Sequence, residues 1–132
     1  MASLGTNVLV RYLVQDDGQQ LALAKKLIKG ALRAGETLYI PVTVMLELEW
    51  VLRTSFGFGK EQVTSTLASL LAATELSFES EAAVEIALAL HQKSAADFAD
   101  CVHIALAHVA GESPLWTFDR AASRVDGAKL LT

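Results

Sequence analysis

The chain has 132 residues, a length that suits one domain with a real hydrophobic core and is short for two. Its net charge of −4 and pI of about 5.3 exclude a protein that holds nucleic acid by bulk positive charge. No apolar run approaches the roughly 20 residues that a bilayer span needs. We therefore expect a single domain over residues 1–132 and no membrane-spanning segment.

Hydrophobic residues make up 52% of the chain and the mean hydropathy is +0.37, which is high for a small soluble protein. Such a composition predicts apolar surface on the monomer and hence a partner or a homodimer. The N-terminus lacks the features of a secretion signal, and the single cysteine, Cys101, cannot form an internal disulfide. We expect a cytoplasmic protein.

Short β-like runs alternate with longer helical patterns, which indicates an α/β fold with a parallel sheet covered by helices on both faces. The expected strands are Ala2–Leu4, Thr37–Ile40, Leu76–Phe78, Leu115–Thr117 and Ala128–Leu131. The expected helices are Val8–Leu13, Gln19–Ala34, Val42–Phe56, Lys60–Ala73, one from Ser80 to about Lys93, and one from Ser94 or Asp97 to Ala110. Thr6 or Asn7 is expected to cap the first helix, and Lys25, Lys26 and Lys29 to form the solvated face of the second.

The helix start within S-A-A-D-F-A-D-C-V-H-I-A-L carries two aspartates at helical spacing. Asp97 and Asp100 are three residues apart, so they lie on the same face of a helix and repel each other. A hard cation such as Mg²⁺ or Mn²⁺ offsets that repulsion better than the helix dipole does. The alternative is that both carboxylates only cap the helix.

The helix after the second strand contains two glutamates in an apolar setting. Glu49 has a natural partner in Arg53, four residues on, in the order that favours a surface ion pair. Glu47 has no such partner within its helix. Its carboxylate is therefore expected either at the rim of the apolar face or buried with a partner, for which a bound cation is suitable.

In open α/β sheets, binding sites form at the carboxyl ends of the strands. Asp119 follows the fourth strand, and the alternative to a site role is that it caps a short helix. Thr117 can hold a water or a carboxylate through its hydroxyl. Arg120 and Arg124, like Arg11, are basic residues that could meet a phosphate or simply be solvated.

Other candidates are weaker. His103 lies three residues after Asp100, a spacing compatible with a shared metal, but no second histidine or cysteine supports a zinc site. His91 and His108 are expected to be exposed helix residues, and Cys101 a small core residue. The absence of a P-loop, G-x-G-x-x-G and G-x-S-x-G disfavours nucleotide switches, dehydrogenases and serine hydrolases.

Four segments together resemble the PIN-domain nucleases, specifically the VapC-type toxins of bacterial toxin–antitoxin pairs. They are T-N-V-L-V-R-Y-L-V at Thr6–Val14, I-P-V-T-V-M-L-E-L-E-W-V-L-R at Ile40–Arg53, A-D-F-A-D at Ala96–Asp100 and T-F-D at Thr117–Asp119. The resemblance implies a three-layer α/β/α fold with a central parallel sheet of about five short strands. It also implies Mg²⁺- or Mn²⁺-dependent cleavage of RNA, often tRNA or rRNA, by a homodimer that a VapB-like antitoxin blocks.

Carried over by position, Asp100 and Asp119 match the family's later acidic residues and metal ligands. Asp97 matches the accessory one, and Glu47 the one on the helix after the second strand. Thr6 and Asn7 match the polar residues that line the site after strand one, and Thr117 remains a further candidate site residue.

Gly5 departs from the resemblance, because the family carries an aspartate, normally a central metal ligand, between the strand-one apolar residue and T-N. Glycine supplies no side-chain oxygen, so metal affinity and rate are expected to fall. We expect an endoribonuclease toxin with weak or no activity. The alternative is a catalytically silent PIN-fold module that binds antitoxin or RNA.

Overall fold

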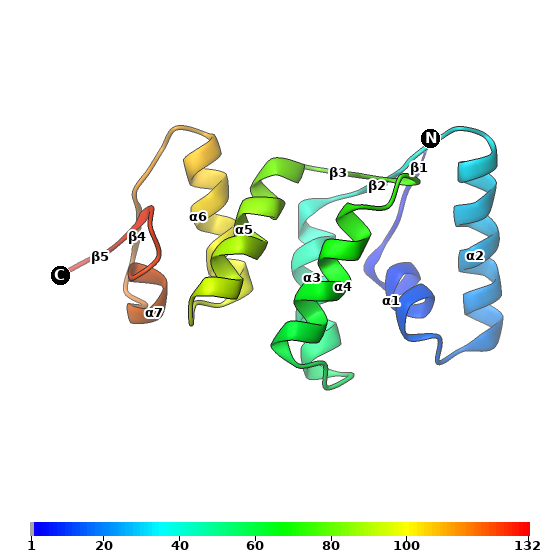
Figure 1. Ribbon diagram of the computed structural model, residues 1–132, viewed down its shortest axis with the longest axis horizontal. Coiled ribbons are helices and arrows are strands. Elements are labelled where there is room, and N and C mark those ends of the chain that lie inside the picture. The colour runs from blue at the N-terminus through cyan, green and yellow to red at the C-terminus, as the bar shows by residue number, and fades with distance from the viewer. Residues whose placement is uncertain (1) are drawn as a thin grey trace. The chain divides into compact units, whose positions relative to one another are not determined.

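The computed structural model describes residues 2–132, which form seven helices and five short strands (Figure 1). By their internal contacts, these residues divide into two compact units, residues 2–79 and residues 80–132. Each unit is described by itself. That residues 1–132 behave as one domain stays a prediction.

The first unit is built on a parallel sheet of three strands in the order β1-β2-β3. The strands are β1 (Ala2–Ser3), β2 (Leu38–Ile40) and β3 (Leu76–Phe78). The first and third residues of β2 and of β3 are buried, which is the alternation that a pleated strand against a core produces. Because the strands are parallel, Gly5, Pro41 and Glu79 follow their carboxyl ends at one edge of the sheet.

Four helices belong to this unit. They are α1 (Thr6–Val14), α2 (Gly18–Arg33), α3 (Val42–Thr54) and α4 (Lys60–Leu71). α1 contacts α2 and α3, α3 contacts α4, and α4 contacts β3. Their apolar stripes form the core, whose fully buried members include Leu9, Met45, Leu48, Leu52 and Leu67.

The first helix begins earlier than expected. Neither Thr6 nor Asn7 caps it, because Thr6 is already its first helical residue and Gly5 is the N-cap in an extended conformation (φ −83°, ψ 165°). The Thr6 hydroxyl bonds to another helix and is not used as a cap. The next helix starts at Gly18, one residue before the expected Gln19, and the Asp17 carboxylate accepts the Gln20 amide as its N-cap.

The second unit pairs two helices with a two-stranded parallel sheet. Its elements are α5 (Glu81–Lys93), α6 (Phe98–Val109), β4 (Leu115–Thr117), α7 (Arg120–Ser123) and β5 (Ala128–Leu130). α5 packs on α6, and α7 contacts both strands that it connects. Gly127 at the turn into β5 has φ +100°, and a Cβ there would lie 3.1 Å from Ile104 Cγ2, so this turn requires glycine.

The α/β class, with short parallel strands and helices between them, is confirmed. The expected single sheet of about five strands is seen as hydrogen-bonded sheets of three and two strands among residues 2–132. Cys101 is buried, as expected for a small core residue. No helix in this part of the chain combines the length and apolarity that crossing a bilayer requires.

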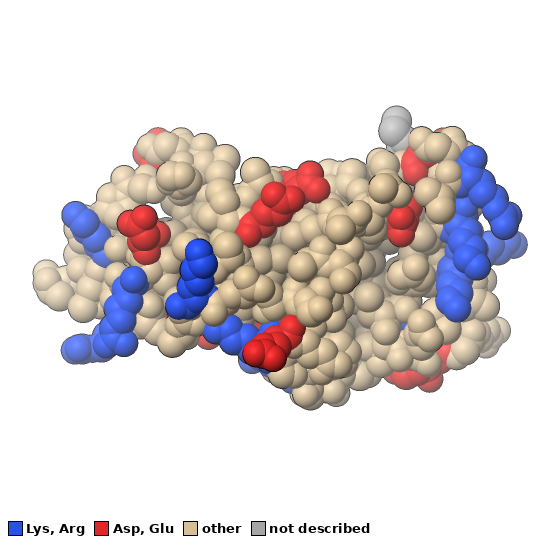
Figure 2. Space-filling view, viewed as in Figure 1, with Lys and Arg blue, Asp and Glu red and all other residues tan. Residues whose placement is uncertain are grey.

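The expectation of exposed apolar surface is also confirmed. On α2, Leu23, Leu27 and Leu32 are exposed, and Trp116 and Phe118 are exposed at β4. Lysine and arginine side chains gather over α2 on the face that Figure 2 shows. The second helix thus carries both the solvated lysines that its pattern predicts and leucines that lie outside the core.

Candidate functional site

The edge of the three-stranded sheet holds a hydrogen bond between two predicted site residues. Thr6 follows the turn after β1 and is buried, and its Oγ1 donates to Oε1 of Glu47 on α3. Glu47 itself is exposed. The partner that Glu47 lacks within its own helix is therefore supplied from α1, at the residue directly after Gly5.

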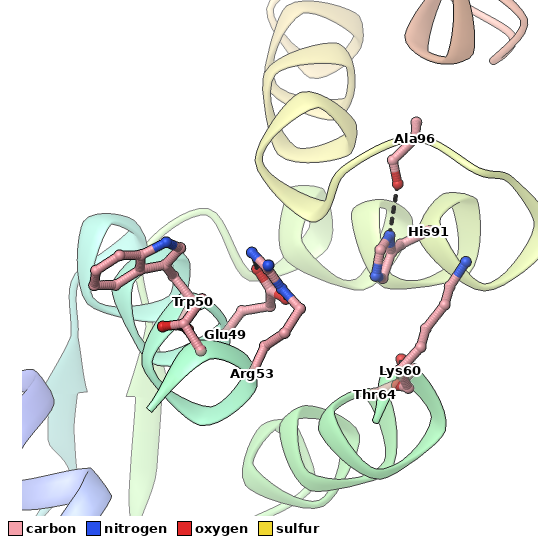
Figure 3. Close-up of polar contacts among 8 residues, drawn as sticks. Glu49, Trp50, Arg53, Lys60, Thr64, His91 and Ala96 are labelled. Atoms are coloured by element: carbon pink, nitrogen blue, oxygen red, sulfur yellow. Dashed lines mark hydrogen bonds and ion pairs between the residues drawn. The ribbon is translucent and has the colours of Figure 1, made fainter. Parts of the chain in front are cut away.

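The two glutamates of α3 differ in burial: Glu47 is exposed, in line with the rim position that was one of its two expected settings, whereas Glu49, expected at the surface, is buried. Glu49 does pair with Arg53, Nε to Oε2 at 2.8 Å, but its side chain is buried and the ion pair is not a simple surface one (Figure 3). The reason is the helical stripe: positions 45, 48, 49 and 52 form the buried face, and Glu49 falls on it. Glu47 lies off that stripe, which leaves its carboxylate accessible.

Gly5 and Asn7 flank Thr6. A Cβ built on Gly5 meets no atom within 4 Å, and its backbone angles are ones that any residue adopts. The glycine is therefore not required by the fold. Asn7 is exposed and lines a groove between α1 and α2 together with Arg11 and Gln20. Arg11 is engaged there, since its Nε donates to Gln20 Oε1 at 2.7 Å.

Glu79 is a polar residue at this edge that the sequence reasoning did not select. It directly follows β3. Its Oε1 accepts a hydrogen bond, 2.8 Å long, from the backbone amide of Val42, which is the first residue of α3. Pro41, the N-cap of that helix, offers no side-chain acceptor, so Glu79 caps the helix from another strand. An acidic residue directly after a parallel strand was the available signal.

In the second unit, the predicted aspartates lie at the N-termini of two helices. Asp97 is the N-cap residue of α6, but its side chain makes no capping hydrogen bond. The interpretation that it merely caps the helix is therefore wrong for Asp97. Asp119 does cap α7, through a 2.8 Å bond from the Ala122 amide to Oδ1. One oxygen of Asp119 is used in this way, and a carboxylate has further lone pairs to offer.

Thr117 supports Asp119 from the end of β4. Its Oγ1 accepts the Asp119 amide at 3.0 Å, so the hydroxyl first serves to shape the turn into α7. The hydroxyl proton remains able to donate, as the prediction of a water or carboxylate contact requires. Arg120 and Arg124, on and after the same short helix, are exposed.

Asp100 lies in the first turn of α6, and the other two aspartates affect its pKa. Its pKa is raised above the ordinary 3.8, first by burial and then by the negative charges of Asp119 and Asp97, while His103 lowers it. Burial and the two carboxylates of Asp119 and Asp97 thus disfavour the ionised form of Asp100. Negative charge is therefore in excess at this end of the second unit. His103 lowers the pKa of Asp100, but the other causes outweigh it.

Carboxylate oxygens are the hard donors that Mg²⁺ and Mn²⁺ prefer, so the donor type suits a divalent cation. Within residues 2–132, no three His, Cys, Asp or Glu side chains are gathered closely enough to hold a metal ion. Charge repulsion acts over longer distances than a ligand bond, and so these aspartates can influence one another without converging.

The predicted residues thus occur in two groups, each within its own unit. Thr6, Asn7 and Glu47 belong to the first unit, where Thr6 and Glu47 are bonded. The second contains Asp97, Asp100, Asp119 and Thr117. That both groups serve one site stays a prediction.

No curated protein matches the sequence. The PIN domain family model matches residues 4–128, a range that contains every predicted site residue. The chain therefore belongs to the PIN domain family, whose members are generally nucleases that use divalent metal ions.

Proposed function

We propose that this protein is a metal-dependent endoribonuclease of the VapC toxin type, impaired by glycine at position 5. The observation that carries the proposal is that Asp119 and Asp97, together with burial, raise the pKa of Asp100 within a chain that matches the PIN family over residues 4–128. A carboxylate whose pKa is raised by neighbouring carboxylates favours the binding of an added cation.

In the proposed reaction, Asp97, Asp100 and Asp119 would hold a divalent ion, and the family resemblance implies Glu47 as a further ligand. When bound, such an ion lowers the pKa of water and stabilises charge on the scissile phosphate and leaving oxygen. The Thr6 hydroxyl orients the carboxylate of Glu47, and the capping bond of Asp119 fixes one of its two oxygens. These contacts restrict the side chains before an ion binds. They therefore reduce the conformational entropy that is lost on binding.

Position 5 determines how active the protein is. The family resemblance implies an aspartate there, and the local geometry accepts one, because the space around a Cβ is open and the backbone is extended. The side chain of residue 5 would start next to Thr6, which is bonded to Glu47. An aspartate at this position is thus expected to add a carboxylate beside Glu47 without disturbing the fold.

The test is RNA cleavage by three forms of the chain: the protein itself, Gly5→Asp and Gly5→Asn. Asparagine is the matched control, because it has the same shape and helix-capping ability but no charge. Total tRNA serves as substrate with Mn²⁺, and EDTA as the metal-free control. We expect Gly5→Asp to cleave at least about 100-fold faster than the other two, since even outer-shell losses cost about 10- to 100-fold in metal sites.

A second variant identifies the carboxylates. Adding Asp100→Asn to Gly5→Asp should return cleavage to the level of the unaltered chain. Equal cleavage by all forms would show that position 5 is not a ligand position. Strong Mn²⁺-dependent cleavage by the unaltered chain would contradict the proposed impairment.

A catalytically silent binding module is the second candidate. It is favoured by Gly5 and by the exposed leucines Leu23, Leu27 and Leu32 of α2, which suit a protein partner. This candidate predicts that neither Gly5→Asp nor the unaltered chain cleaves RNA or binds Mn²⁺. Measurement of Mn²⁺ affinity for both forms therefore separates the two proposals even if the RNA chosen is wrong.

We further propose the cellular setting that goes with a VapC-type toxin. The partners are an RNA substrate such as tRNA or rRNA, a VapB-like antitoxin and a second copy of the chain. The exposed apolar side chains support the need for a protein partner. The single buried Cys101 is consistent with a cytoplasmic location, where thiols stay reduced.

A further inference from the structure

The connection between α5 and α6 is held by a histidine that the sequence pattern did not single out. His91 was expected to be an exposed helix residue, but it is half-buried, and its Nδ1 lies 2.9 Å from the carbonyl oxygen of Ala96 (Figure 3). Its ring also packs edge-on against Phe98, with centroids 5.8 Å apart and planes at 67°. His91 therefore contacts the residue before Asp97 and the residue after it.

Ser94 completes this arrangement from the end of α5. Its hydroxyl donates to the carbonyl of Leu90 at 2.8 Å and accepts the amide of Ala96 at 3.3 Å. Both backbone polar groups of the buried Ala96 are thus bonded to side chains, the amide to Ser94 and the carbonyl to His91. The backbone that enters Asp97 is fixed in place by these two bonds.

Asp97 depends on its backbone more than a usual N-cap residue does. Its φ of −61° and ψ of 149° match an N-cap, but its side chain makes no capping hydrogen bond that would hold it to α6. The direction of the carboxylate is consequently determined by how residues 96 and 98 are held. Those are the two residues that His91 contacts.

We propose that His91 is a positioning residue for the Asp97 carboxylate, acting through the Ala96 carbonyl; this inference rests on the proposed metal-dependent function. The Ala96 oxygen can only accept, so the proton must be on Nδ1 of His91, and Nε2 takes no part in the contact. The hydrogen bond sets the position of the chain at Asp97, and the ring contact with Phe98 supports it. His91 itself touches neither the ion nor the substrate.

Two substitutions separate positioning from packing. His91→Asn keeps an N–H donor at the place of Nδ1 but loses the ring, whereas His91→Phe keeps the ring and loses the donor. If His91 positions Asp97 by its hydrogen bond, asparagine retains the function and phenylalanine does not. If His91 only fills space, the order is reversed. His108→Phe is the control, because His108 is an exposed histidine near the other end of α6.

The experiment is titration of each variant with Mn²⁺ alone, with free Mn²⁺ followed by electron paramagnetic resonance, in both the unaltered and the Gly5→Asp chain. Thermal melting of each variant verifies that it is folded. We expect His91→Phe to weaken Mn²⁺ binding about tenfold, the lower end of the effect of outer-shell changes. His91→Asn should stay within about twofold, and His108→Phe should not change.

The outcomes distinguish this inference from the proposed function. Binding of Mn²⁺ that His91→Phe leaves intact, or that His91→Asn weakens more than His91→Phe does, overturns the positioning role and leaves the metal site standing. If neither the unaltered nor the Gly5→Asp chain binds Mn²⁺, the proposed function fails and the positioning role fails with it.

Discussion

Thr6 donates a hydrogen bond through Oγ1 to Oε1 of Glu47, which lies 41 residues further along the chain. The bond joins the first residue of α1 to α3, at the edge of the sheet where β1 ends. It pairs a buried hydroxyl with an exposed carboxylate, so one end is fixed by packing and the other faces solvent. The bond fixes the orientation of the Glu47 carboxylate. Its donor, Thr6, directly follows residue 5, the predicted ligand position.

Replacement of Thr6 by valine should remove this bond while preserving the shape of the side chain. We expect the free energy of unfolding in urea to fall by about 1–2 kcal/mol, because a bond to a charged acceptor is lost. The control is a double-mutant cycle with Glu47→Ala, which should show a coupling energy of about 1 kcal/mol. A coupling near zero would show that the bond adds no stability in solution.

Substitution of Gly5 tests the N-cap of α1 separately from activity. Gly5→Asn should raise stability by about 0.5 kcal/mol, since asparagine caps a helix and is less flexible than glycine in the unfolded chain. Gly5→Asp should gain less in the absence of metal, because the new carboxylate lies near Glu47. Addition of Mn²⁺ should then raise the melting temperature of Gly5→Asp and leave that of Gly5→Asn unchanged. Equal responses of the two variants would argue against a ligand role for position 5.

Asp100 makes stability dependent on pH. Its pKa in the folded state is raised above 3.8 by burial and by Asp119 and Asp97, so the folded protein binds this proton more readily than the unfolded chain does. The contribution of Asp100 to the free energy of unfolding is therefore largest at low pH and falls as the pH rises through its folded pKa. We expect Asp100→Asn to be more stable than the unaltered chain at pH 7, by roughly 0.5 kcal/mol after allowance for solvent screening.

That gain should shrink as the pH falls through the folded pKa and reach zero below 3.8, where Asp100 becomes protonated in the unfolded chain as well. Urea unfolding curves over this pH range give the comparison. Asp126→Asn, an exposed aspartate of the same unit, is the control and should show no comparable gain. A loss of stability in Asp100→Asn at pH 7 would show that the carboxylate is favourably paired and not repelled.

The ion pair of Glu49 with Arg53 is expected to matter because one partner is buried. Arg53→Ala removes the 2.8 Å contact and should lower the free energy of unfolding by about 1–2 kcal/mol. The loss is smaller than for a fully buried pair, since the Arg53 side chain is half exposed and water can partly replace it. Adding Glu49→Met should recover most of the loss, because a buried charge is then replaced by an apolar side chain.

Arg33→Ala supplies the reference for this comparison, because Arg33 is an exposed arginine in the last turn of α2. Its stability should change by less than about 0.5 kcal/mol. If the two arginine variants lose the same stability, the pair with Glu49 contributes no more than an ordinary surface arginine.

Features within a few residues of one another were predictable from the sequence. The start of a helix at Asp97, the capping of α7 by Asp119 and the pairing of Glu49 with Arg53 each depend on contacts no more than four residues apart. Helix geometry alone brings such groups together, so their spacing in the sequence is sufficient. The alternation of short strands with helices likewise predicted the α/β class.

Tertiary structure decided which side chains meet across elements. The bond from Thr6 to Glu47, the capping of α3 by Glu79 and the effect of Asp119 on Asp100 join elements far apart in the chain. Periodicity states which face of a helix is apolar, but it does not say what that face packs against or which turn lies beside it. The sequence by itself therefore determined the fold class and the acidic candidates, and only the packing of the elements decided their partners and burial.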